Sequence, residues 1–361
     1  MNRMYRIAVI VLLGAVLAPS QGAKAQNEQD IIAFLQAGEE DAAKLIQAYV
    51  EPAVISMSYG MAGGWYNTAK PHKSLGFDIG ITMNMAFIPT SENYFDPNKL
   101  NLSSYTTYNG NIDKPGKGAP TFFGPKDETS YTSDPDGTGP LTPITFNGPE
   151  GLDLKNKIGF AATPVPMIQL GIGVIKNTDI KIRFVNSGMV GAIIPNADLK
   201  NSDFSIFGIG VMHDIKQHIK GIKLLPFDLS ALVAYNSVTG SSDVSNDDPG
   251  AGPESSNGEL DYKFNSWVIQ GLISKKISVL TGYAGLGYSI VNTNVDVKGD
   301  YDIDPGSGTF MLNDPVAIDF KNNSMRLTVG MRLKFGPFYL NGDYTFQKYN
   351  TVSFGLGFSV R

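Results

Sequence analysis

The sequence contains no cysteine, only three histidines and only two tryptophans. The absence of cysteine excludes disulfide bonds and thiol chemistry. Beyond the N-terminal region, no stretch approaches eighteen uninterrupted apolar residues, so we expect no transmembrane helix in the mature chain. There is also no excess of positive charge, since 29 basic residues stand against 34 acidic ones. We therefore expect no nucleic-acid partner.

The first 25 residues have the features of a secretory signal peptide. Arg3 and Arg6 form a basic head, an apolar core follows, and Ala23-Lys24-Ala25 is a small-x-small cleavage site. Cleavage there predicts a mature chain that starts at Gln26. With the three basic residues of the signal removed, 26 basic and 34 acidic residues remain, a net charge of −8. Export without a later apolar span is typical of an outer-membrane protein.

The last forty residues alternate apolar and polar side chains with a period of two. In one run the apolar residues are Met325, Leu327, Val329, Met331, Leu333 and Phe335. Gly336-Pro337 breaks this run, and two similar runs follow before the chain ends. Each run of roughly ten residues is long enough to cross a bilayer as a tilted strand. The pattern predicts an all-β fold, a transmembrane antiparallel β-barrel of the bacterial outer membrane.

Similar runs begin near residue 75, and we predict about ten strands, within a range of eight to fourteen, over residues 74–361. Short connections at 176–178, 274–276 and 336–337 are expected on the periplasmic side. Long loops at 91–156, 241–261 and 292–321 are expected outside the cell. This asymmetry is typical of outer-membrane barrels, whereas a soluble β-sandwich would not explain it.

Residues 26–73 form a separate helical, plug-like segment before the first strand. Gly38 interrupts its helical pattern, and we expect Pro52 to end the second helix. Residues 53–73 have no regular period and include Trp65, Tyr66 and His72. The apolar helix stripe must cover an apolar surface. Two alternatives remain open: a periplasmic helix packed under the barrel, or a plug inside it.

Several charged residues fall on the predicted inward face of the strands and are lumen candidates. They are Asp78, Arg326, Arg332 and Asp343. We expect Arg332 to lie opposite Asn341 and to pair with Asp343, because an unpaired buried guanidinium is costly. Four Gly-apolar-Gly triplets place their glycines on the same inward face. These are 171–173, 208–210, 285–287 and 355–357. The glycines either ease barrel curvature or leave room for a plug or a solute.

No arrangement of residues indicates an enzyme. No Ser-His-Asp or paired-carboxylate pattern stands out. His213 and His218 are five residues apart, a poor spacing for metal ligands on one helix face, so we expect no metal and no cofactor. Residues 214–223 are instead predicted to form a short amphipathic helix at the membrane interface.

Two stretches carry a resemblance to known proteins. Residues 64–78 read GWYNTAKPHKSLGFD, and His213-Asp214-Ile215-Lys216 leads to LPFDL at 225–229. With these the chain resembles an uncharacterised outer-membrane barrel family of bacteroidete-type bacteria. It is more loosely similar to outer-membrane long-chain fatty-acid transporters, in which an N-terminal plug precedes the barrel. Glu51-Pro52-Ala53 stands where those proteins have Asn-Pro-Ala.

The leading functional expectation is passive passage of a small solute through a plugged barrel, and in its narrower form this solute is apolar. The alternative is a structural or surface-binding barrel that acts through its long extracellular loops. Outer-membrane lipid is the expected surrounding partner in both cases. The sequence leaves the oligomeric state open.

Overall fold

The computed structural model describes residues 31–134, 143–175, 177–189, 202–245, 253–303 and 310–360. The predicted signal peptide and the start at Gln26 therefore lie outside the described residues. Ten antiparallel strands form a closed barrel, because β11 pairs with both β10 and β12 at the ends of the sheet. The barrel strands are β1 (Phe77–Phe87), β7 (Ala162–Ile175), β8 (Thr178–Asn186), β9 (Ser202–Asp214), β10 (Asp228–Asp243), β11 (Glu259–Ile277), β12 (Leu280–Lys298), β16 (Ser324–Phe335), β17 (Phe338–Phe346) and β18 (Thr351–Val360). The predicted fold and strand count are confirmed.

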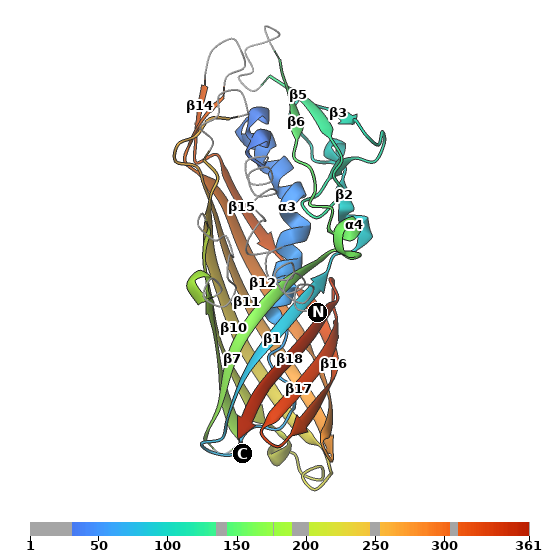
Figure 1. The fold of residues 1–361 in the computed structure, drawn as a ribbon, viewed down its shortest axis with the longest axis vertical. Helices are drawn as coiled ribbons and strands as arrows, with labels where there is room; N and C mark the ends of the chain where they lie inside the picture. The colour runs from blue at the N-terminus through green and yellow to red at the C-terminus, as the bar shows by residue number, and fades with distance from the viewer. Residues whose placement is uncertain are drawn as a thin grey trace, which may run out of the picture.

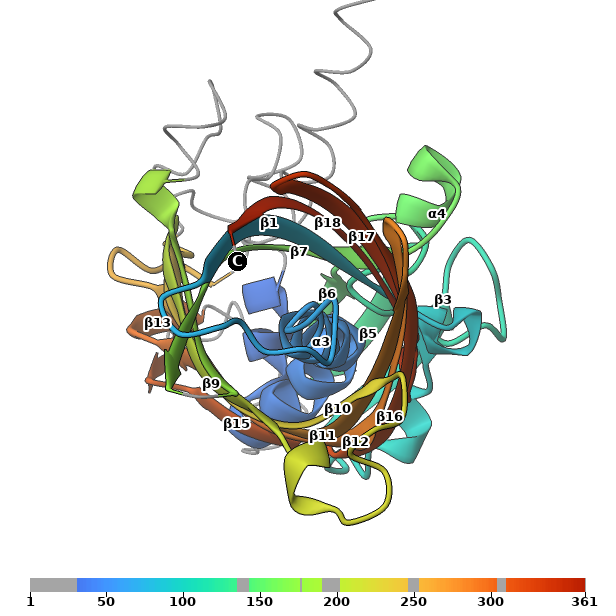
Figure 2. The ribbon, with the colours of Figure 1, turned by 90° about the horizontal axis from the view of Figure 1, so that it is seen from below.

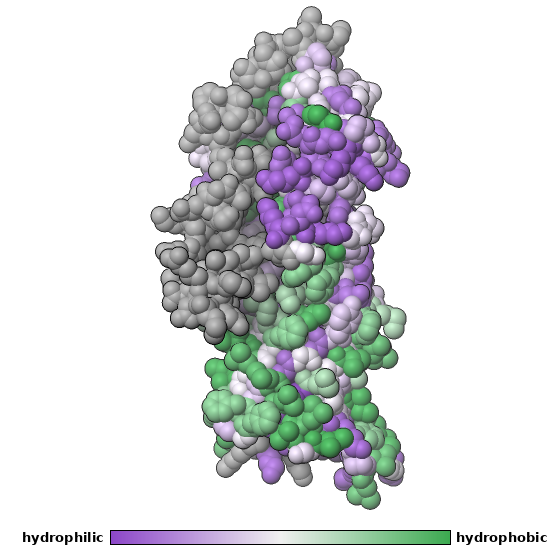
Figure 3. All heavy atoms as spheres, turned by 45° about the vertical axis from the view of Figure 1, so that its right-hand side comes forward, coloured by the Kyte–Doolittle hydropathy of each residue, from purple (hydrophilic) through white to green (hydrophobic). Residues whose placement is uncertain are grey.

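The alternation along the strands separates lipid-facing from lumen-facing side chains as the sequence predicts. On β16, all six apolar residues from Met325 to Phe335 are exposed, whereas Arg326, Thr328 and Arg332 are buried. Successive side chains of a strand point to opposite faces, so one period-two pattern supplies both surfaces. Hydrophobic side chains gather on the lower part of the molecule, and hydrophilic ones cover much of its upper part (Figure 3).

The connections differ in length at the two ends of the barrel. β7–β8, β11–β12 and β16–β17 are joined by short turns at the same end as the C-terminus, the lower end of Figure 1. In outer-membrane barrels the short turns face the periplasm, so the upper end is extracellular. The predicted asymmetry is correct, but the β11–β12 turn lies at Ser278 and Val279 rather than at 274–276. Ser278 adopts a left-handed φ of 55°, which this tight turn requires.

The extracellular connections fold into a cap instead of remaining plain loops. The region 91–156 contains five short strands, two 3₁₀ turns, η2 (Thr90–Asn93) and η3 (Pro97–Lys99), and a short helix, and the region after β12 forms a further hairpin and strand. These elements are β2 (Tyr94–Phe95), β3 (Thr106–Asn111), β4 (Ala119–Pro120), β5 (Thr129–Ser133), β6 (Ile144–Gly148), α4 (Leu154–Ile158), β13 (Asp300–Ile303), β14 (Phe310–Asn313) and β15 (Val316–Lys321). β15 pairs with β12, so the cap continues the barrel wall outward.

Helix α3 (Glu39–Ala62) lies inside the ring of strands, as the view along the barrel shows (Figure 2). Of the two alternatives, the structure therefore places the helix within the barrel and not under it. The expectation that Pro52 ends the helix is wrong, and residues 53–62 are helical. Proline removes one backbone hydrogen bond but does not prevent a helix from continuing when packing holds both sides. No described helix is both long and apolar enough to cross a membrane.

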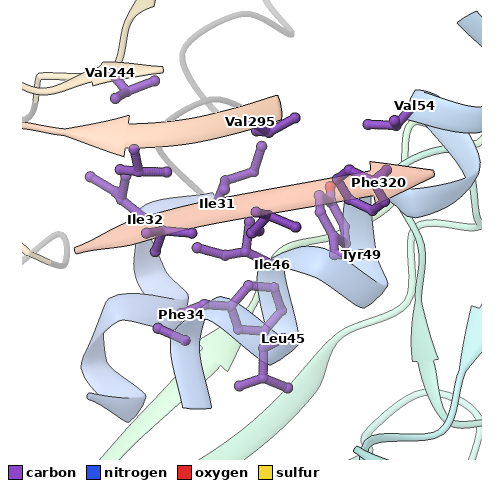
Figure 4. Packing of buried hydrophobic residues seen from close by; sticks show 14 of the residues in the cluster. Ile31, Ile32, Phe34, Leu45, Ile46, Tyr49, Val54, Val244, Val295 and Phe320 are labelled. Carbon is purple, nitrogen blue, oxygen red and sulfur yellow. The ribbon is translucent and has the colours of Figure 1, made fainter. Parts of the chain in front are cut away.

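The upper part of α3 and the preceding helical turn η1 (Ala33–Ala37) form the centre of an apolar core (Figure 4). Phe34, Leu45, Ile46 and Tyr49 are fully or almost fully buried there. Their neighbours come from the outer ends of the barrel strands and from the cap, and include Tyr131, Phe146, Val295, Ile318 and Phe320. The apolar stripe predicted from the sequence thus covers the inside of the extracellular cap.

Candidate functional site: the lumen segment

Residues 63–76, which we call the lumen segment, continue from the end of α3 to the periplasmic end of the barrel, where β1 begins. Gly64 makes the first bend with a left-handed φ of 67°. A Cβ atom there would lie 2.7 Å from Thr82 Cγ2 and 2.8 Å from Asn84 Oδ1 on β1. Only glycine meets both the backbone angle and this close approach to the wall.

Trp65 is the largest fully buried side chain of the lumen segment. Its ring lies against Gly208 and Gly210 of β9, where an added Cβ would come within 3.1 and 3.0 Å of the ring atoms. On the other side, the guanidinium carbon of Arg183 lies 3.7 Å from the ring centroid, which is cation–π geometry. The two glycines therefore provide the space that the indole occupies.

Tyr66 lies against another glycine of the wall, Gly285 of β12. A Cβ on Gly285 would lie 2.1 Å from the Tyr66 hydroxyl oxygen. Gln270 Nε2 donates to that hydroxyl at 3.3 Å, and Tyr283 packs edge-on against the ring. The prediction that the Gly-apolar-Gly glycines face inward is correct. At 208–210 and 285 they make room for aromatic side chains of the lumen segment.

Two buried arginines bind the C-terminal end of α3. Arg183 Nη1 donates to the carbonyl oxygen of Met61 at 3.3 Å, and Arg326 Nη1 donates to that of Ala62 at 2.7 Å. Asn236 Nδ2 also donates to Met61 O, at 3.3 Å. The last carbonyls of a helix lack partners within the helix and carry partial negative charge, so the three wall residues act as its C-terminal cap.

His72 holds the lower end of the lumen segment at the periplasmic mouth. Its Nδ1 atom lies 2.9 Å from Asp179 Oδ2, and its backbone N–H donates to Asp179 Oδ1 at 2.7 Å. Its Nε2 atom lies 3.4 Å from Ser359 Oγ and 3.5 Å from Asp78 Oδ1. Lys334 Nζ also donates to Ser359 Oγ, at 3.0 Å.

We call His72, Asp78, Asp179, Lys334 and Ser359 the His72 clasp. In it Ser359 contacts His72 and His72 contacts Asp179, the same sequence of contacts as in the catalytic triads of acyl-transfer enzymes, although the residues are far apart in the chain. Three features favour a positional role. Ser359 is buried, its hydroxyl oxygen already accepts from Lys334, and His72 Nε2 is shared with the Asp78 carboxylate. Because both aspartates approach the imidazole, the group fits a positional role better than that of a general base.

The predicted ion pair between Arg332 and Asp343 is wrong. Arg332 does lie opposite Asn341, as predicted, but its guanidinium stacks over Tyr339 at 4.4 Å. Asp343 pairs in register with Gly330 and accepts from the Tyr283 hydroxyl at 3.0 Å. The ion pairs found within the described part of the chain do not join these two residues. Each of the two charged groups instead contacts an aromatic side chain of the lumen, Tyr339 for Arg332 and Tyr283 for Asp343.

His213 and His218 meet at the periplasmic end of β9, outside the lumen. Their Nε2 atoms are 3.1 Å apart, and His213 Nδ1 lies 2.8 Å from Thr178 Oγ1. The helix predicted over 214–223 is wrong, because β9 runs to Asp214 and only a short turn, η4 (Lys216–His218), follows. Among the residues that the structure describes, no group of three or more acidic or histidine side chains is placed to hold a metal ion.

All seven lumen candidates from the sequence are in or against the barrel interior. They are Trp65, Tyr66, His72, Asp78, Arg326, Arg332 and Asp343. Arg183, Asp179 and Asn236, which contact the helix end and His72, were not among the residues predicted from the sequence. A signal was present in the alternation of β8, where Asp179, Lys181 and Arg183 fall on the face opposite Ile180 and Ile182. Ionisable residues on the inward side of a barrel strand are worth a functional hypothesis.

Solved structures with a similar arrangement are outer-membrane barrels of low sequence identity. Ail, the attachment invasion locus protein of Yersinia pestis, is 7% identical, covers 80% of this chain and 100% of its own, and has a TM-score of 0.26. The translocator domain of the autotransporter NalP from Neisseria meningitidis is 10% identical, with 91% and 99% covered and a TM-score of 0.29. The toluene transporter TodX of Pseudomonas putida is 7% identical, with 80% and 89% covered and a TM-score of 0.25. At such scores no function transfers from these proteins.

Curated proteins gave no match to the sequence. A family model does match, over residues 1–360, and its description is a family of unknown function. This agrees with the expectation of an uncharacterised family. The match gives no support to a bacteroidete origin or to kinship with fatty-acid transporters. With its ten-stranded barrel and a helix in the lumen, the chain belongs to the DUF6588 family of unknown function.

Proposed function

We propose that the protein is a gated outer-membrane pore, closed by residues 31–76, through which a small solute passes when the lumen segment and the lower part of α3 leave the wall. The observation that carries this proposal is the polar, incompletely satisfied contact between this segment and the barrel. Within the described residues, Trp65 Nε1, Asn84 Nδ2, Gln270 Oε1 and Arg326 Nε are buried without a hydrogen-bond partner. Water entering the lumen would satisfy these groups.

The chemistry of the wall supports a polar solute. Beside an apolar cluster that joins Trp65 and Tyr66 to wall residues such as Leu232, Val268 and Leu272, the lining contains many buried amides, hydroxyls and charged groups. They include Asp78, Asn84, Gln169, Asn236, Gln270 and Thr328. A permanent contact between a plug and a wall is expected to be mainly apolar, like the interface of an obligate complex. The apolar form of the expected solute gains no support from these polar groups, since they would have to lose water to admit it.

Two engineered disulfides test whether the segment must move. Thr68 Oγ1 lies 3.2 Å from Ser274 Oγ of β11, so the pair Thr68→Cys and Ser274→Cys would tether the lumen segment. Ser56 Oγ lies in hydrogen-bond contact with Thr163 Oγ1 of β7, so the corresponding cysteine pair would tether α3. The chain has no other cysteine to interfere.

We expect both oxidised proteins to lose solute uptake in liposomes and conductance in planar bilayers, and to regain them on reduction. Each single-cysteine variant serves as the matched control. Equal passage through the oxidised and reduced forms would sink the gating proposal. Tethers are more informative than deletion of residues 27–70, because the deletion also removes Phe34 and Leu45 from the core of the cap.

A second candidate function, surface binding, is favoured by the cap itself. Its chain folds around an apolar core that includes Tyr131 and Phe146, and so offers a defined surface instead of free loops. Absence of any solute or ion flux through the reduced, untethered protein would favour this function over passage. A folded cap that keeps its protease resistance in that preparation is the necessary control.

A further inference from the structure

We propose that Arg183 and Arg326 form a binding site for a small oxyanion, and that the carbonyl oxygens at the end of α3 occupy this site while the pore is closed. The inference rests on the proposed gating and adds to it the chemical class of the solute. Phosphate, sulfate and a carboxylate share the required chemistry, which is two or more oxygens that carry negative charge.

Both guanidinium groups are removed from solvent, with Arg183 0% and Arg326 2% exposed. Each gives one N–H to a carbonyl oxygen of consecutive residues, Met61 and Ala62. The end of a helix carries partial negative charge on such oxygens, so the helix presents the arginines with a weak substitute for an anion. The substitute is incomplete, because a peptide group is neutral overall and each of the two oxygens takes only one N–H from these arginines.

The hydrogen-bond inventory of the two arginines shows the deficit. Arg183 Nε donates to Gln169 Oε1 at 2.9 Å, and Arg326 Nη1 also reaches Ser289 Oγ at 3.2 Å. Arg183 Nη2 and Arg326 Nε remain buried with no hydrogen-bond partner in the described structure. A guanidinium presents its donors as a planar fork that matches the oxygens of phosphate or carboxylate. An oxyanion would satisfy donors that α3 leaves unused.

The charge balance at this level of the lumen also favours an anion. Asp343 is the nearest buried carboxylate, and it accepts from the Tyr283 hydroxyl instead of forming an ion pair with either arginine. Asp78 and Asp179 lie lower, at the His72 clasp. Two buried positive charges therefore face one carboxylate, and clusters of arginine select anions in pores.

A tryptophan reporter gives a direct binding test. The chain has two tryptophans, so Trp267→Phe leaves Trp65, which packs on Arg183, as the only one. In detergent, we expect sodium phosphate at constant ionic strength to shift Trp65 emission to the red, because the anion displaces the helix end and water reaches the indole. Arg183→Gln or Arg326→Gln should weaken this response at least tenfold, and Lys263→Gln, on the outer face of β11, should not.

Selectivity gives the second readout. In a KCl gradient we expect the reversal potential of the untethered protein to report preference for chloride, and both glutamine variants to lose most of it. If a glutamine variant does not give a heat-modifiable barrel, Arg326→Lys replaces it, keeps the charge without the fork, and should still weaken the phosphate response about tenfold.

The outcomes separate the two proposals. Conductance that depends on the tethers but shows no anion preference, with no phosphate response at Trp65, overturns the anion site and leaves gating intact. A phosphate response of equal size in the glutamine variants also overturns the site. Conductance that ignores the tethers overturns gating itself, whatever its selectivity.

Discussion

The upper and lower halves of the barrel interior are filled by one continuous stretch of chain, but buried polar and charged partners are concentrated in the lower half, beside a smaller apolar cluster. In the upper half, Phe34, Leu45 and Ile46 of η1 and α3 pack against valine, isoleucine and phenylalanine of the wall. In the lower half, Trp65, Tyr66 and His72 meet arginine, glycine, glutamine and aspartate. Apolar contacts need no particular partner, whereas each buried polar group needs a matching one.

We therefore expect the upper contact to stabilise the fold and the lower contact to open more readily. The upper contact resembles the core of a domain and should open only with the cap. The lower contact depends on a few hydrogen bonds and on close glycine–aromatic fits, several of them incomplete, so it should open at lower free-energy cost. Four substitutions test this division, from the largest expected effect to the smallest.

Phe34→Ala should destabilise the cap most. The ring is buried and lies edge-on to both Tyr49 and Tyr131, at 6.0 and 5.7 Å between centroids. Loss of such a ring typically costs about 3–5 kcal/mol of unfolding free energy. Limited proteolysis of the cap on intact cells measures it, with Tyr105→Ala, an exposed aromatic of the cap, as the control. If the barrel but not the cap resists heat in this variant, the two halves are separable as proposed.

Asp179→Asn should loosen the lower half without affecting the cap. The substitution keeps the size of the side chain but removes the charge that faces His72 Nδ1. A hydrogen bond to a charged group is worth about 1.5–3 kcal/mol, so the open population should rise roughly tenfold to 150-fold. Single-channel recording measures this rise, and Glu259→Gln, an exposed carboxylate on β11, is the control. Conductance that stays at the wild-type level would show that the contact between Asp179 and His72 does not contribute to gating.

Gly285→Ala should displace Tyr66 from its position. The new methyl group would meet the hydroxyl at 2.1 Å, and overpacking of this kind costs about 1–3 kcal/mol. Gly282→Ala, on the same strand with no atom within 4 Å of the added Cβ, is a matched control. Adding Tyr66→Phe removes the clashing oxygen, so conductance of the double variant should return toward that of the wild type. Failure of this rescue would mean that the added methyl group changes conductance by displacing residues of the barrel wall instead of Tyr66.

The smallest effect is the acid sensitivity of the top of α3. Burial alone would raise the pKa of Asp41, but hydrogen bonds from Ser103 and Thr106 outweigh it, so this pKa lies below its usual value of 3.8. A lowered folded-state pKa means that the contact stabilises the cap above that value and is lost as the pH falls through the folded-state pKa. Asp41→Asn should therefore cost about 1 kcal/mol at neutral pH and progressively less at an acid pH, as the folded-state pKa is approached and passed. Thermal melting against pH measures this, and an equal loss at both pH values would contradict it.

The sequence predicts the barrel well because a strand needs only local alternation. The inward placement of Arg326 and Arg332 followed from counting by two along a single run. The partners of these residues did not follow, because Ala62 and Tyr339 come from other elements whose positions depend on the whole fold.

The error at Pro52 has the same origin. Proline disfavours a helix interior by local energetics, but here the surrounding wall stabilises both sides of it. Ser56 and Gly60 follow Pro52 on α3, and they let the helix approach β7 so closely that a Cβ on Gly60 would lie 2.6 Å from Val165 Cγ2. Small residues after a proline were therefore a sign of close packing, which the sequence alone could not assign to a partner.

The position of the upper end of α3 has a consequence for how the molecule is assembled. The described part of the chain begins in the cap at Ile31, descends through the lumen, and only then turns upward as β1, which closes the barrel against β18. A finished barrel could accept this helix only by threading its apolar end, with Phe34, past the whole polar lumen. The helix is therefore expected to be in place before the first and last strands join, so that closure of the ring and burial of the helix are one event during biogenesis.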